Sequence, residues 1–127
     1  MAIFGVGIDL VEVARVREAM ERFGDRFKNR IYALTEQRFC ESQKGKYLSY
    51  AARFAAKEAF SKALGTGLRG KISWRDVVVI DNEKSPPKLR IEGKAKQILD
   101  NRNVYLSITH TQNYASVVVI IEENNKC

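Results

Sequence analysis

The sequence predicts one globular domain that combines α-helices with β-strands. Residues 51–67, AARFAAKEAFSKALGTG, are rich in alanine, contain no glycine or proline before Gly65, and end at Gly65 and Gly67, as a helix does. Apolar runs with many β-branched residues lie near both ends of the chain, at 3–13 and 114–121, and are typical of buried strands. We therefore expect residues 1–127 to form a single domain.

The length and composition support a cytoplasmic protein with a hydrophobic core. The chain has 127 residues, of which 45% are hydrophobic. Its apolar runs are shorter than the roughly 20 residues of a membrane span, and the N-terminus lacks the pattern of a signal peptide, so we expect no membrane partner. Cys40 and Cys127 lack metal-ligand spacing and are predicted to be free thiols.

The net charge of +7 indicates a polyanionic partner. Nucleic acid, a phosphorylated cofactor and an acidic protein all fit the charge. A nucleic-acid-binding module is the competing functional class. Against it, the sequence has no aromatic-rich strand motif and no recognisable helix-turn-helix, and its basic residues are interleaved with acids.

The first predicted strand, 3–13, contains a carboxylate in an apolar setting. Asp9 needs a charged partner, a metal or access to water, or else it caps the helix that follows. Gly5 and Gly7 indicate either close packing of the strand backbone or a bulge.

The next segment, 12–27, has apolar residues at spacings of three and four and is predicted to be a helix that Gly24 breaks near its end. Its outward face is basic. This face is either solvated, with local ion pairs, or a docking surface for an acidic helix with Met20 as an apolar anchor. The basic residues on it are Arg15, Arg22 and Arg26.

A short helix at 35–42, capped by Thr35, precedes the alanine-rich helix, which we expect to begin near 46 or 48. The small side of the alanine-rich helix should be buried, and it carries Ala52, Ala55, Ala56, Ala59 and Ala63. The opposite side carries Arg53, Lys57, Glu58, Ser61 and Lys62. Glu58 either pairs with Lys62 at the i,i+4 spacing or holds a cation.

The second half of the chain supplies more strands. A glycine-rich loop at 65–72, with Arg69 and Lys71, is a turn that could contact an anion. Residues 81–87 have turn chemistry between two strands. His110, the one histidine in the sequence, ends a strand at a tight turn, where it is either a structural hydrogen-bonding residue or part of a site. The predicted elements are strands at 77–80, 88–91, 104–110 and 114–121 and a helix at 92–103.

Three motifs, GIDLVEVARV, RFAAKEAFSKALGTG and SITHTQNYASVVVI, together resemble the holo-acyl-carrier-protein synthases, the short phosphopantetheinyl transferases. The resemblance covers nearly the whole chain in the same order. It implies the α+β 4′-phosphopantetheinyl transferase fold, in which an antiparallel sheet packs against a long central helix. It also implies a homotrimer with active sites between subunits.

The resemblance further implies a Mg²⁺-dependent transfer of 4′-phosphopantetheine from coenzyme A to a serine of apo acyl carrier protein, which releases 3′,5′-ADP and supports fatty acid biosynthesis. Asp9 and Glu58 match the family's metal-binding carboxylates, a role that suits the oxygen ligands Mg²⁺ prefers. Lys62 would contact a phosphate and stabilise the charge that develops as 3′,5′-ADP leaves. The implied catalytic residues are Asp9, Glu58 and Lys62.

The remaining implied residues bind the substrates. The last-strand turn would approach the nucleotide from a neighbouring subunit, and we expect His110 to bind rather than to catalyse. Acyl carrier proteins are acidic, so the basic first helix would dock them. The implied coenzyme A residues are Arg53, Lys57, Lys62, Gly65, Thr66, Gly67, Thr109 and His110. The implied carrier-protein residues are Arg15, Met20, Arg22 and Arg26.

Overall fold

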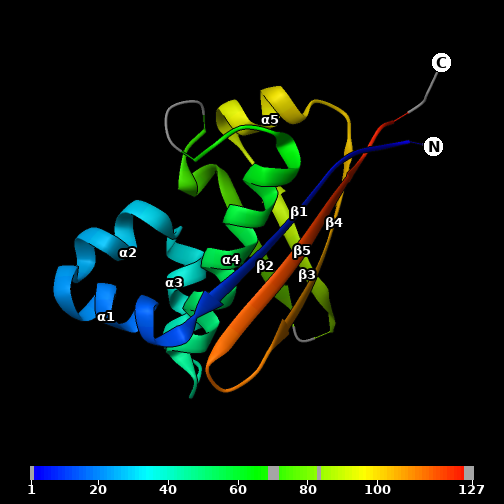
Figure 1. Ribbon diagram of the computed structural model, residues 1–127. Coiled ribbons are helices and arrows are strands. Elements are labelled where there is room, and N and C mark those ends of the chain that lie inside the picture. The colour runs from blue at the N-terminus through cyan, green and yellow to red at the C-terminus, as the bar shows by residue number, and fades with distance from the viewer. Residues whose placement is uncertain (1, 69–71, 83, 125–127) are drawn as a thin grey trace.

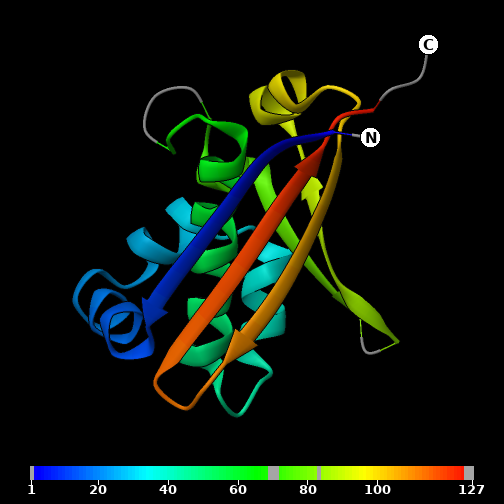
Figure 2. The same ribbon diagram turned by 45° about the vertical axis from the view of Figure 1, so that its right-hand side comes forward.

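The computed structural model describes residues 2–68, 72–82 and 84–124. The predictions made above for Arg69, Lys71 and Cys127 fall outside these residues. A three-stranded antiparallel sheet has the order β1-β5-β4. Helix α4 (Lys46–Leu64) packs against one face of this sheet, as Figures 1 and 2 show. The predicted antiparallel sheet is thereby confirmed. The three strands are β1 (Ile3–Glu12), β4 (Asn103–His110) and β5 (Tyr114–Glu122).

The other elements surround α4. Three helices connect β1 to α4, and a two-stranded antiparallel sheet of β2 and β3 lies beyond it (Figure 1). The connecting helices are α1 (Val13–Phe23), α2 (Asp25–Ile31) and α3 (Leu34–Glu41). The remaining elements are the 3₁₀ helix η1 (Trp74–Asp76), β2 (Val77–Asn82), β3 (Ser85–Ile91) and α5 (Gly93–Leu99).

Strand β1 and helix α4 pack with their backbones in contact. A Cβ atom built on Gly5 would lie 1.9 Å from the carbonyl oxygen of Ala63, and one built on Gly7 would lie 1.9 Å from that of Ala59. A side chain cannot occupy either position without moving the helix away from the strand. Close packing, one of the two interpretations of these glycines, is therefore confirmed, and small residues on both elements allow it. The register of β1 with β5 also shifts between Ile3 and Gly5.

Helix α4 is buried on more sides than its sequence indicated. The predicted alanine side is buried, and Gly65 ends the helix with a φ of 86°, as predicted. The expectation that the opposite side would face outward is wrong for Arg53, Lys57 and Ser61, which are at most 3% exposed. Helices α3 and η1 and strand β2 cover that side, and none of these contacts is visible in the helical period of α4 alone.

Several boundaries differ from the prediction for local reasons. Gly24, with a φ of 58°, does break the first helix, but a second helix, α2, follows it. The N-cap of α3 is Ala33 rather than Thr35, and its N–H donates to Glu36 at 2.9 Å. Helix α5 ends earlier than predicted, before Asp100, whose φ is 61°.

The turn between β2 and β3 is also tighter than predicted. Ser85, Pro86 and Pro87 belong to β3 rather than to the turn. Proline cannot donate a backbone hydrogen bond, and it is tolerated here because β3 has one hydrogen-bonded neighbour in its two-stranded sheet.

We predict that Gly7→Ala destabilises the protein by about 3 kcal/mol, because the new methyl group would collide with the backbone of α4. Urea unfolding measures this loss. Gly45→Ala is the matched control, since the nearest atom to its new Cβ would be 3.9 Å away. Equal stability of the two variants would contradict the close contact between β1 and α4.

Candidate functional site

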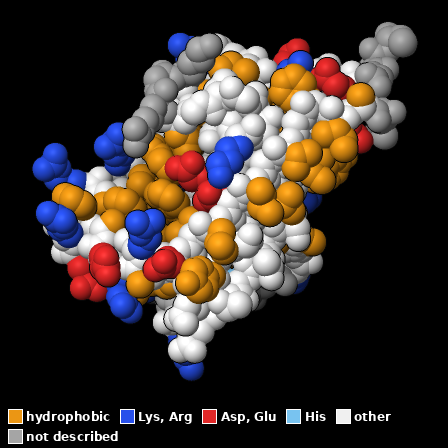
Figure 3. Space-filling view, viewed as in Figure 1, with side chains coloured by type: hydrophobic (Ala, Val, Ile, Leu, Met, Phe, Trp, Pro, Cys, Tyr) orange, Lys and Arg blue, Asp and Glu red, His pale blue; other side chains and the backbone are white. Residues whose placement is uncertain are grey.

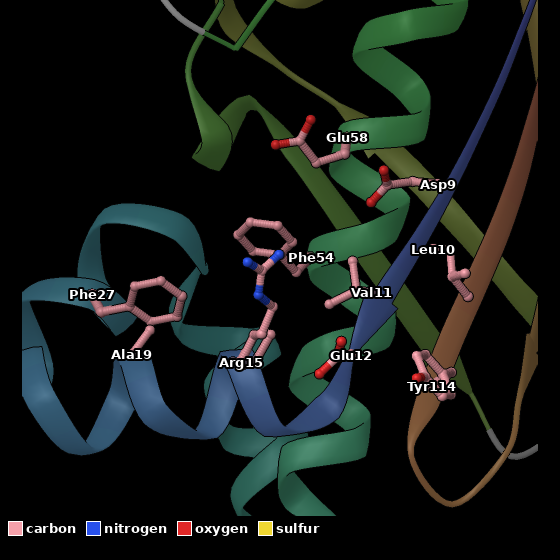
Figure 4. Close-up of a pocket in the computed structure, with 11 residues that line it drawn as sticks. Asp9, Leu10, Val11, Glu12, Arg15, Ala19, Phe27, Phe54, Glu58 and Tyr114 are labelled. Carbon is pink, nitrogen blue, oxygen red and sulfur yellow. The ribbon is translucent and has the colours of Figure 1, made fainter.

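A cavity of about 560 Å³ lies where β1, α1 and α4 meet. Asp9 from β1 and Glu58 from α4 both line it, and Figure 4 shows both side chains at the same end of the cavity. The guanidinium of Arg15 points into the same cavity from α1. A strand and two helices thus place these two carboxylates and this guanidinium in the same cavity.

Strand β1 determines the position of Asp9. The residue pairs with Val117 of β5 and does not cap α1, whose N-cap is Glu12, so the capping alternative is wrong. Gly5, Gly7 and Asp9 alternate along β1 and share the strand face that meets α4. The side chain of Asp9 is 17% exposed, which leaves its carboxylate open to the cavity.

The side chain of Lys62, which belongs to α4, extends to the carboxylate of Asp9. Its Nζ atom donates to Oδ1 of Asp9 at 3.1 Å and to the carbonyl of Ile8 at 3.0 Å. The lysine side chain is 53% exposed, so the ammonium group can move toward a ligand without leaving a buried position. In Figure 3, acidic and basic side chains lie side by side near the middle of this face.

Aromatic rings form the apolar wall of the cavity. Phe27 and Phe54 stack with ring centroids 6.4 Å apart, and the ring of Phe54 lies 4.9 Å from that of Trp74. Figure 4 shows the Phe54 ring beside the Arg15 guanidinium. The cavity therefore combines charged groups at one end with a surface that suits an apolar chain.

The donor set of this cavity fits a divalent cation that a ligand completes. Among the residues that the structure describes, no group of three or more His, Cys, Asp or Glu side chains could hold a metal. Mg²⁺, however, is often bound through one or two carboxylates with phosphate oxygens and waters. Asp9 and Glu58 supply those two carboxylates.

A second cavity, of about 420 Å³, lies between α4, α3 and the β2–β3 pair. Arg53 and His110, both predicted to bind coenzyme A, line it together. The Arg53 guanidinium is ion-paired with Asp81, hydrogen-bonded to Ser49 Oγ at 2.9 Å and stacked 4.5 Å from the centroid of the Phe39 ring. The second cavity is therefore lined by the guanidinium group of Arg53, whose position is fixed by these contacts.

Lys57 does not join either cavity. Its side chain is fully buried, and Nζ donates to Glu36 Oε1 at 2.7 Å and to the carbonyls of Trp74 and Val77. Burial lowers the pKa of Lys57, and the Glu36 carboxylate opposes that shift. Lys57 therefore connects α4 to α3 and β2 in this chain, and the prediction that it faces a ligand is not supported by its position.

The other predicted ligand residues are spread over the surface. Gly65, Thr66 and Gly67 follow the C-terminal end of α4, twelve or more residues from Arg53, which is about 18 Å along a helix. The Oγ1 atom of Thr66 is buried without a hydrogen bond in the described part of the chain. Thr109 alternates with His110 along β4, so the two side chains take opposite faces of the strand.

The residues predicted for the docking face differ in their exposure. Arg15, Arg22 and Arg26 are exposed, although Arg26 belongs to α2 rather than α1. Met20 is 5% exposed and lies in the core, so it cannot be the anchor. Phe23 is 54% exposed, and Arg22 lies 5.5 Å from the centroid of its ring. The apolar group on this surface is therefore Phe23.

Sequence reasoning missed the partners of the buried charges. Glu36, the partner of Lys57, lies in the segment that was predicted to be a short helix. Asp81, the partner of Arg53, lies in the segment that was predicted to be a turn. Phe54, which the sequence placed within the alanine-rich helix, is a wall of the first cavity. A pattern could have found Phe54, since it is three positions before Lys57 and four before Glu58. No local signal identifies the two acids.

Comparisons with known proteins agree with this arrangement. A family model described as the 4′-phosphopantetheinyl transferase superfamily matches residues 5–119. A holo-[acyl-carrier-protein] synthase of Koribacter versatilis is 46% identical over 124 residues, which cover 95% of this chain and 99% of the relative.

Solved structures show the same fold. The holo-[acyl-carrier-protein] synthase of Neisseria meningitidis matches with a TM-score of 0.88 at 30% identity, covering 96% of this chain and 100% of that one. The enzyme of Bacillus anthracis, solved in complex with CoA (3′,5′-ADP), matches with a TM-score of 0.79 at 34% identity, covering 96% and 98%. The similarity thus extends over nearly the whole chain.

We predict that Lys57→Met destabilises the protein by about 3–5 kcal/mol, because the Glu36 carboxylate stays buried without its cation. Urea unfolding measures the loss, and Glu36→Gln added to Lys57→Met should restore part of it. Glu92→Gln, which removes the exposed pair of Glu92 with Arg90, is the control and should change stability by about 0.5 kcal/mol or less. A loss no larger than the control's would show that the buried pair does not hold α3 to α4.

Proposed function

Because the chain belongs to the 4′-phosphopantetheinyl transferase superfamily, we propose that it transfers 4′-phosphopantetheine from coenzyme A to a serine of apo acyl carrier protein, with Mg²⁺ as cofactor. The observation that carries the proposal is the cavity in which Asp9 and Glu58 meet and Lys62 contacts Asp9. The holo carrier protein formed by this reaction would serve fatty acid biosynthesis.

The reaction is a displacement at phosphorus. The serine hydroxyl releases its proton to solvent, its oxygen forms a bond to the phosphorus that carries the pantetheine, the bond from that phosphorus to the ADP oxygen breaks, and 3′,5′-ADP leaves. Such transfers depend mainly on alignment and on stabilisation of negative charge. Asp9 and Glu58 would hold Mg²⁺, which when bound would neutralise the pyrophosphate oxygens.

Lys62 would interact with the same negative charge of the phosphate groups. Its exposed ammonium group lies within hydrogen-bonding distance of Asp9, and from there it can reach a phosphate beside the two carboxylates. It would stabilise the negative charge on the departing 3′,5′-ADP. Arg15, which points into the cavity, adds a second cation on the α1 side.

The nucleotide of coenzyme A would lie in the second cavity. Arg53 would bind its 3′-phosphate, and His110 lines the same cavity. The loop of Gly65, Thr66 and Gly67 lies at the far end of α4 from Arg53, so within one chain these groups do not surround one nucleotide. We assign them to a site that is completed by a second copy of the chain.

The assembly would be a homotrimer that buries the outer face of the three-stranded sheet. On β1 the residues that alternate with the packed glycines point away from α4 and are apolar and exposed. Figure 3 shows hydrophobic side chains over the strands on this surface. Exposed apolar surface of this kind is typical of an interface. It includes Phe4, Val6, Ile8, Leu10 and Tyr105.

The carrier protein would dock on α1 and α2. Arg15, Arg22 and Arg26 supply positive charge for an acidic partner, and Phe23 supplies the apolar contact. These helices adjoin the first cavity, because Arg15 lines it and Phe27 forms part of its wall. A serine on the docked partner would therefore lie near Asp9 and Glu58.

We predict that intact-mass measurement of apo acyl carrier protein, incubated with the protein, coenzyme A and Mg²⁺, will show the gain of one phosphopantetheine arm. EDTA should abolish the gain. Asp9→Asn and Glu58→Gln should each slow it by about a hundredfold or more, since each removes a ligand of the Mg²⁺ that would neutralise the pyrophosphate oxygens. Asp100→Asn, an exposed acid after α5, is the control and should retain activity. Transfer at the wild-type rate by both site variants would refute the assignment.

For docking, we predict that Arg22→Glu raises the KM for acyl carrier protein by about tenfold at low salt, with the kcat and the KM for coenzyme A nearly unchanged. The effect should shrink as salt screens the charges. Lys94→Glu, the same charge change on the exposed surface of α5, is the control. If the two variants have the same KM for the carrier protein, α1 is not the docking surface.

A further inference from the structure

The cation of the second cavity is held in place from several sides. The side chain of Arg53 is 4% exposed, its guanidinium stacks on the Phe39 ring, and it donates to Ser49 through both Oγ and the backbone carbonyl, at 2.9 and 3.4 Å. Its Nε atom is buried without a hydrogen bond in the described part of the chain. The guanidinium thus has contacts with Ser49 and Phe39 in addition to its ion pair with Asp81.

Asp81 occupies the remaining side of this guanidinium. It lies in β2 where the register with β3 shifts between Ile80 and Asn82, and its carboxylate pairs with the NH2 group of Arg53. The Asp81 side chain is 21% exposed, about five times the fraction of its partner. One half of this pair is thus fixed in the core, and the other half borders water.

The cavity is otherwise suited to an anion. Asp81 is the one acid among the described residues that line it, and His110 and Gln43 are the other hydrogen-bonding groups beside Arg53 and Ser49. A phosphate that approached the Arg53 NH2 group would meet the Asp81 carboxylate at the same donors. Two anions this close repel each other, so one of them must move or the phosphate must bind more weakly.

We infer that Asp81 is an internal competitor for the 3′-phosphate of the coenzyme A nucleotide at Arg53, and that its carboxylate gives up this ion pair when the nucleotide binds. The inference rests on the proposed function. Asp81 then sets the affinity for the substrate and favours release of the 3′,5′-ADP product, because the carboxylate returns to Arg53 as the phosphate leaves. The opposite role, in which Asp81 orients Arg53, predicts the opposite change in affinity.

The test is calorimetric titration of 3′,5′-ADP and of 5′-AMP into the wild-type protein, Asp81→Asn and Glu92→Gln. Asp81→Asn should bind 3′,5′-ADP about tenfold more tightly, because the competing charge is gone. It should bind 5′-AMP with an affinity within about twofold of the wild type, because that nucleotide lacks the 3′-phosphate. Glu92→Gln removes an acid from an exposed arginine pair and should change neither affinity.

The outcomes separate the inference from the function. Unchanged or weaker binding of 3′,5′-ADP by Asp81→Asn overturns the competitor role while the transferase proposal stands. An equal gain for both nucleotides also overturns it. A wild-type protein that binds neither 3′,5′-ADP nor coenzyme A overturns the proposed function and the inference with it.

A second variant guards against misfolding of the first. Asp81→Ser also removes the charge, and circular dichroism checks the fold of both variants. Inorganic phosphate should raise the thermal unfolding temperature of either folded variant more than that of the wild type, because free phosphate then meets no competitor at Arg53. A smaller rise in both variants than in the wild type would overturn the inference independently of any nucleotide.

Discussion

The backbone contact between β1 and α4 determines where the candidate site lies. Gly5 meets Ala63 and Gly7 meets Ala59, so two residues of strand advance along four residues of helix. These steps are nearly equal, about 6.7 Å for the strand and about 6 Å for the helix, which keeps the two elements in register. Asp9, the next residue on the same strand face, therefore lies beside the turn of α4 that carries Glu58. Lys62 reaches it because helical side chains lean toward the N-terminus.

The same helix uses its charged residues in two different ways. Lys57 and Arg53 are buried and paired with acids from α3 and β2, whereas Glu58 lines a cavity and Lys62 is half exposed. A buried charge without a partner is costly, so the Lys57–Glu36 pair fixes which side of α4 can face the core. Glu58, the residue after Lys57, then lies on the side of α4 that lines the first cavity. The buried pair thus acts on the site by orienting the helix.

The sequence predicted the parts of the fold that depend on local pattern. The first strand, the alanine side of α4 and the glycine that ends α4 were predicted, and close packing at Gly5 and Gly7 was one of two interpretations of that strand. The pairing of Lys57 with Glu36 and of Arg53 with Asp81 joins residues 21 and 28 positions apart, and no local period encodes that. Met20 is a different case, because it belongs to the apolar positions of α1 that are spaced by three and four, and this stripe faces the core. Asp9 and Glu58 were singled out because acids in apolar or basic surroundings are unusual, and the family resemblance then implied their metal-binding role.

The separation of the two cavities gives the strongest physical reason to expect more than one copy of the chain in the working enzyme. Asp9 and Glu58 face the cavity between β1, α1 and α4, while Arg53 and His110 face one beyond the other side of α4. In the proposed reaction, a single coenzyme A has its pyrophosphate at Asp9 and Glu58 and its 3′-phosphate at Arg53. If the helix lies between them within one chain, the arginine that serves a given pair of carboxylates is supplied by a neighbour. The apolar outer face of β1, which has no cover in the described chain, lies on the side from which such a neighbour could approach.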